Sequence, residues 1–68
     1  MITQMMVMVD KLHHAQMANT FAWLAREEVR KIANLLCLGI PMCALRGEVD
    51  LLDHQVRQME HHFELATS

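Results

Sequence analysis

The chain has 68 residues, which is enough for one small domain. Its six basic and eight acidic residues give a formal net charge of -2, which argues against nucleic acid as the main partner. Hydrophobic residues make up 53% of it, more than a two-helix protein can cover by itself, so we expect apolar surface left over for association. The longest uncharged stretches, 12–25 and 32–45, are shorter than the roughly 18 apolar residues of a membrane-spanning helix, which predicts no membrane contact.

The N-terminal run 1–9 is uncharged and rich in methionine, with no basic residue before it. A signal peptide has a basic segment ahead of its apolar one, so this run does not resemble a signal peptide. A cytoplasmic location is the resulting expectation. Unbranched methionine side chains adapt to uneven surfaces, which suits contact with another protein.

Apolar residues at steps of three and four predict a first helix over about 3–37. Its main stripe is expected to face the second helix and comprises Ala22, Ala25, Val29, Ile32 and Leu36. An upstream stripe follows the same rule out of phase and comprises Met5, Met8, Leu12 and Ala15. Two alternatives follow: one continuous helix, or a break near 18–20, where Asn19 and Thr20 are suitable N-cap residues.

A turn is predicted over 38–41, because Gly39 is typical of a helix end and Pro41 of the first turn of a new helix. So short a connection folds the two helices back on each other. The predicted fold is therefore an all-α antiparallel two-helix hairpin, forming one domain over 1–68 and completed by dimerisation or by a partner protein.

The second helix is predicted over about 42–65, where the apolar stripe is most regular. That stripe comprises Met42, Leu45, Val49, Leu52, Val56, Met59, Phe63 and Ala66. Gly47 lies inside this predicted helix and lowers its stability by about 1 kcal/mol relative to alanine. Candidate protein-interface residues are three from the first helix and six from this stripe: Phe21, Trp23, Leu24, Leu45, Val49, Leu52, Val56, Met59 and Phe63.

The sequence contains no arrangement typical of catalysis, so we expect neither enzyme activity nor a cofactor. The adjacent pairs His13-His14 and His61-His62 diverge around their helices, which predicts exposed imidazoles and no metal site. An antiparallel hairpin would bring the two pairs near each other, which leaves a metal site as the alternative. Cys37 and Cys43 are spaced unlike any zinc or redox motif and are expected to be small buried thiols near the turn.

In its pattern and length the chain resembles the small YscE-like co-chaperones of bacterial type III secretion systems. The resemblance rests on the helix 22–38, the turn around Gly39 and the amphipathic helix 45–65. It implies a cytoplasmic helical hairpin that, with a tetratricopeptide-like co-chaperone, holds a needle subunit unpolymerised. The N-terminal run 1–9 and Pro41 depart from that family's pattern.

The alternative is a homodimeric four-helix bundle that acts as a small regulator of phage or plasmid type. Val49 and Val56 alternate with Leu45 and Leu52, a pattern that suits paired helices. Both functions make similar demands on the sequence, and the chain is expected to form a homodimer when its partner is absent.

Overall fold

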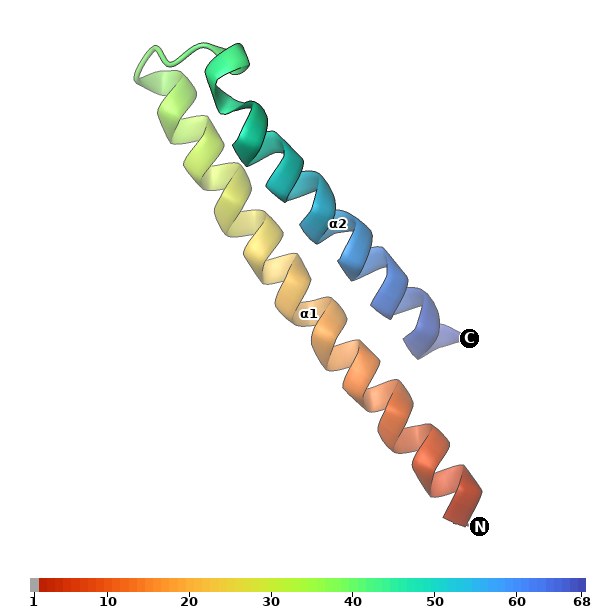
Figure 1. Cartoon of the computed structure of the whole chain (residues 1–68). Coiled ribbons are helices and arrows are strands. Elements are labelled where there is room, and N and C mark those ends of the chain that lie inside the picture. The colour runs from red at the N-terminus through yellow and green to blue at the C-terminus, as the bar shows by residue number, and fades with distance from the viewer. Residues whose placement is uncertain (1) are drawn as a thin grey trace.

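The computed structural model describes residues 2–68, with side chains from Met5 onward. Helix α1 spans Ile2–Cys37, a short 3-10 helix (η1) spans Met42–Leu45, and helix α2 spans Arg46–Thr67. The helices lie side by side and antiparallel in a rod 58 Å long and 15 by 13 Å across (Figure 1). This confirms the predicted all-α helical hairpin.

Helix α1 continues without interruption through residues 18–20. Thr20 donates its hydroxyl hydrogen to the backbone carbonyl of Gln16 at 3.0 Å instead of capping a new helix. Such a bond to the carbonyl four residues earlier is common for threonine inside a helix. Of the two alternatives that the sequence left open, the structure has the continuous helix.

The turn is built around Gly39, whose φ of 89° is a left-handed conformation that glycine adopts without steric cost. The backbone amide of Ile40 donates to the carbonyl of Leu35 at 3.1 Å, and that of Gly39 donates to the carbonyl of Leu36 at 3.0 Å. This pair of bonds is the Schellman motif that ends many helices. Pro41 is extended, and the chain then enters η1 before α2, so the start of the predicted second helix is 3-10 rather than α.

Each helix buries or half-buries a line of residues at steps of three and four, which we call the inner face. Two contacts set its register: His14 with His62, and Glu28 with Glu48. The contacts are 14 residues apart on both helices, from 14 to 28 and from 62 back to 48, so the antiparallel pairing is regular between them. The inner face comprises His14, Ala18, Phe21, Ala25, Glu28, Ile32 and Leu35 of α1, Leu45 of η1, and Glu48, Leu52, Gln55, Met59, His62 and Ala66 of α2.

The predicted apolar stripes are therefore only half right. Val29 and Leu36, expected to face α2, are 51% and 41% exposed, and Phe63 is 62% exposed. The apolar residues occupy three columns along each helix, whereas one partner helix can cover only about two. The helices bury a column that contains polar side chains and leave an apolar column at the side.

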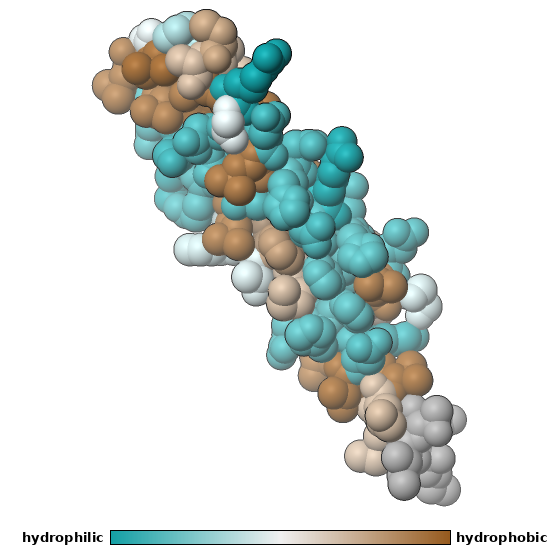
Figure 2. Space-filling view, in the orientation of Figure 1, coloured by the Kyte–Doolittle hydropathy of each residue, from teal (hydrophilic) through white to brown (hydrophobic). Residues whose placement is uncertain are grey.

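We call this uncovered side of the hairpin the lateral face. Its members form one column on each arm of the hairpin, and within each column they recur every seven residues. All of them except Met42 directly follow an inner-face residue. In an antiparallel pair, this position puts the two columns on the same side of the hairpin. Figure 2 shows apolar surface at both ends of the rod, around the turn and along the start of α1. The lateral face comprises Ala15, Ala22, Val29, Leu36, Met42, Val49, Val56 and Phe63.

Candidate interaction surface

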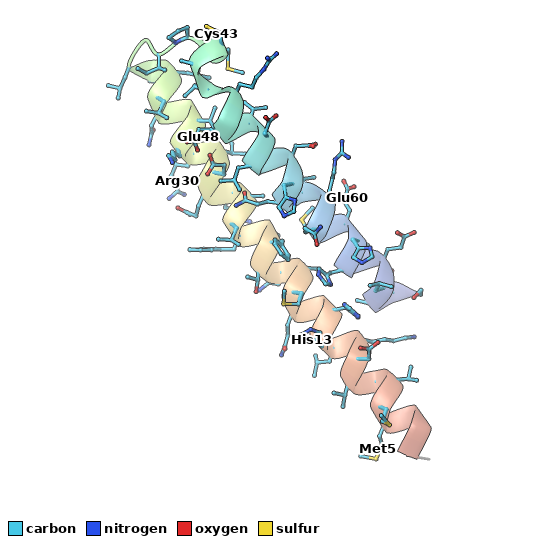
Figure 3. All side chains as sticks on the ribbon, viewed as in Figure 1. Met5, His13, Arg30, Cys43, Glu48 and Glu60 are labelled. Atoms are coloured by element: carbon cyan, nitrogen blue, oxygen red, sulfur yellow. The ribbon has the colours of Figure 1, made fainter. Side chains whose placement is uncertain are left out.

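The start of α1 extends past the end of α2 as an uncovered helix, which we call the N-terminal arm (Ile2–Val9). Ser68 lies six residues beyond His62, so by the register it is level with residue 8 of α1. Figures 1 and 3 show the arm, with Met5 on it, projecting beyond α2. Apolar side chains surround its second half, Met5–Val9, and those of Met5, Met6, Met8 and Val9 are 65–71% exposed. A helical stretch that is apolar on every side is typical of a segment that another protein chain covers.

A groove of about 650 Å³ lies on the lateral face where the two helices approach the open end of the hairpin. Its lining includes Met59, Glu60 and Phe63 with Asn19 and Thr67, and its remaining residues are alanines, which leave room above the backbone. Small side chains here let a bulky side chain from elsewhere approach the backbone closely. The alanines are Ala15, Ala18, Ala22 and Ala66.

The predicted interface residues are distributed over several sides of the hairpin. Leu45 is only 4% exposed and packs inside the hairpin, so a partner could not reach it without opening the structure. Trp23 and Phe63 are exposed at 58% and 62%, but Trp23 lies on the outer side of α1 and Phe63 on the lateral face. The remaining six are half-buried: Phe21, Leu24, Val49, Leu52, Val56 and Met59.

Two parts of the exposed apolar surface were missed as interface candidates. Val29 and Leu36 were assigned to the helix-helix contact, although they lie on the lateral face. The run that contains Met5 and Met8 was predicted to suit contact with another protein, but neither residue was among the nine candidate interface residues. The signal was present in the sequence, since the arm combines five consecutive apolar residues with no charge until Asp10.

Polar side chains occupy the middle of the inner face. Glu28 is 7% exposed and hydrogen-bonds Glu48, whose carboxylate lies 3.2 Å from the ammonium group of Lys31. The hydrogen bond to Glu48, together with burial, raises the pKa of Glu28. The same bond and the Lys31 charge lower the pKa of Glu48. Of the two carboxyls, Glu28 is therefore the one that is more easily protonated and Glu48 the one that is more easily ionised.

Two buried oxygens on this face, Oε1 of Glu28 and Oε1 of Gln55, have no hydrogen-bond partner among the side chains described, 5–68. A buried acceptor without a partner typically costs about 1–3 kcal/mol. The inner face therefore stabilises the hairpin less than its length suggests.

The histidines form a layer across the open end of the hairpin. Nδ1 of His14 lies 2.8 Å from Nδ1 of His62, so one ring donates a hydrogen bond and the other accepts it. The His62 ring also stacks on Phe21, with ring centroids 5.8 Å apart. Burial, followed by the neighbouring histidines, lowers the pKa of His62. The prediction of exposed imidazoles is wrong for His14 and His62, because the antiparallel register places them on the inner face.

The approach of the histidine pairs does not complete a metal site. Within residues 5–68, no group of three or more histidine, cysteine, aspartate or glutamate side chains is close enough to hold a metal ion. Cys37 and Cys43 are both free and exposed, so the prediction of buried thiols is wrong. Both lie on the outer side of the turn region, where no other helix of the hairpin covers them. Figure 3 shows Cys43 at this end of the molecule.

Comparison with protein-family models, curated proteins and solved structures finds no match to this chain. Across the described residues, neither helix has an apolar stretch of the length and hydropathy that crossing a membrane requires.

Proposed function

We propose that this chain is a non-catalytic helical interaction module that binds another protein through its N-terminal arm and lateral face. The observation that carries the proposal is the arm, whose Met5, Met6 and Met8 side chains are 68–71% exposed on a helix that α2 does not cover. Methionine suits this task, because its flexible thioether fits partners of irregular shape. Folding alone leaves this surface in water, and binding would remove it.

The specific function proposed is that of a small cytoplasmic co-chaperone in type III secretion. Its partner would be a tetratricopeptide-like co-chaperone, a needle subunit, or both. What supports this is the form of the molecule: a short hairpin with many large apolar side chains left exposed. A concave helical groove of the tetratricopeptide kind could accept the arm as an added helix.

The alternative function is that of a homodimeric regulator. The observation that favours it is the lateral face, which is apolar over both helices and carries no charged side chain. In this alternative the second copy would be the final partner rather than a temporary cover.

The test is to mix the purified chain with a tetratricopeptide-like co-chaperone and a needle subunit, and to measure mass by light scattering after gel filtration. We expect a one-to-one complex with the co-chaperone, or a ternary complex that also contains the needle subunit. Met8→Asp should abolish the complex, because it places a charge on the arm, whereas Gln16→Asp should leave it intact. Absence of a complex, or equal binding by Met8→Asp, would refute the proposal.

A further inference from the structure

We propose that the lateral face is the interface of an antiparallel homodimer, in which two copies of this chain form a four-helix bundle. This deepens the proposed function by naming what covers the same surface when no other protein is bound. The inference rests on three observations: the weak inner face, the composition of the lateral face, and the unequal lengths of the two helices.

The inner face alone is a poor core for a folded domain. Its buried apolar residues are Ala18, Ala25, Ile32 and Leu45, and two of these are alanines. Between them lie polar layers that include Glu28 and Gln55, each with one buried oxygen unpartnered among the described side chains. Domains of this size usually need a further source of stability, and a second apolar layer would supply it.

The lateral face is extensive enough to supply that layer. Its larger residues are well exposed: the exposed fractions of Val29, Leu36, Met42 and Phe63 range from 41% to 62%. Together the exposed parts amount to roughly 500 Å² of apolar surface per copy, so two copies would bury about 1,000 Å², near the lower limit for a specific interface. The arm adds further apolar area to this total.

A second copy fits this face because the face is complementary to itself. All eight of its residues are apolar and recur every seven positions on both helices. A two-fold dimer sets the same patch against itself, and the eight lateral residues bring no charge to it, although Glu60 also lines the groove that the two copies share. The long stripe also matches the seam by which helices pair in bundles.

The lengths of the helices favour the antiparallel arrangement. Helix α1 has 36 residues and α2 has 22. If two copies pack face to face in parallel, α1 lies over α2 of the other copy and the arm extends past its end. If they pack antiparallel, α1 lies over α1, and each arm rests on the turn half of the other lateral face, over Val29 and Leu36. Only this arrangement covers the arm with apolar side chains of the dimer itself.

The groove then lies near the middle of the dimer. The alanine-lined parts of the two grooves lie against each other there, and each Phe63, which the register places level with residue 13 of α1, lies over α2 of the other copy, near Val49 and Val56. Because its side chain is 62% exposed in the single hairpin, Phe63 contributes to the dimer far more than to the hairpin fold. It is therefore the residue whose substitution separates association from folding.

The first test uses the purified chain alone, in sedimentation equilibrium. We expect a dimer of the wild type, with a thermal midpoint that rises with protein concentration, because association stabilises the folded state by mass action. Phe63→Asp should weaken the dimer at least 100-fold. Trp23→Asp is the matched control, since Trp23 is 58% exposed on the outer side of α1. A monomeric wild type, or a Phe63→Asp variant that dimerises normally, would overturn the proposal.

The second test measures orientation and does not depend on whether Phe63→Asp folds. A spin label on the native Cys37, in a Cys43→Ser background, reports the distance between the turn ends of the two copies. At about 1.5 Å per helical residue, the antiparallel dimer places the labels roughly 50 Å apart or more, whereas a parallel dimer places them within about 25 Å. The short distance would refute the antiparallel interface. Since no other protein is present, either result is independent of binding to a co-chaperone.

Discussion

Gln55→Met should stabilise the protein, although it removes a polar residue from a helix. Gln55 is 9% exposed on the inner face, and its Oε1 accepts no hydrogen bond from any of the described residues. Methionine has nearly the same length and a similar helix propensity, so it can occupy the same space without distorting α2. The change therefore removes an unsatisfied acceptor and keeps the packing.

The size of the effect follows from the burial of that oxygen. An unpartnered buried acceptor costs about 1–3 kcal/mol, and the amide nitrogen of Gln55 loses some favourable hydration or bonding on replacement. We therefore expect a gain of about 1–2 kcal/mol in the free energy of unfolding. For a chain of this size each kcal/mol corresponds to roughly 4–8 °C in the thermal midpoint.

Urea denaturation followed by circular dichroism measures this gain, at one fixed protein concentration so that association contributes equally to every variant. Gln16→Met is the matched control, because Gln16 is exposed on the outer side of α1 and should change stability by less than about 0.5 kcal/mol. If Gln55→Met is neutral or destabilising, the Gln55 oxygen has a partner in solution and the account of a weak inner face is wrong.

Two further predictions concern the histidine layer and the glycines. Because the pKa of His62 is lowered in the folded protein, the unfolded chain binds a proton at this residue more readily. The contribution of His62 to the free energy of unfolding should therefore be fully present above about pH 6.5 and should decrease as the pH falls below that value, which thermal melts would show. His62→Phe should flatten this dependence, and His54→Ala, which removes an exposed histidine outside the layer, should retain it. A wild type equally stable at pH 5.5 and 7.5 would contradict the reasoning. Gly47→Ala should stabilise α2 by about 1 kcal/mol, since the new methyl group meets nothing within 4 Å. Gly39→Ala should destabilise by about 1 kcal/mol because of its positive φ, and equal effects of the two alanines in urea denaturation would contradict this.

The hairpin was predictable from local signals, whereas the faces of its helices were not. Gly39 and Pro41 mark the turn by their own backbone chemistry, and the periodicity of the second half is strong enough to indicate a helix. Periodicity does not say which two of three apolar columns will be buried, because that depends on the partner helix. Glu28 and Gln55 are therefore buried where Val29 and Val56 were expected, and the contact between His14 and His62 follows from this rotation.

The inner and lateral faces are expected to have different roles, and one final prediction tests both roles together. The polar inner layers fix the register of the hairpin, as His14 with His62 and Glu28 with Glu48 illustrate. In the proposed dimer, the lateral face would supply stability through association. Loss of the dimer in Phe63→Asp would then lower the stability of the hairpin, and adding Gln55→Met should raise helicity again without restoring the dimer. Circular dichroism and sedimentation on the double variant separate the two effects. A double variant that regains the dimer, or that gains no helicity, would show that the inner and lateral faces do not act independently.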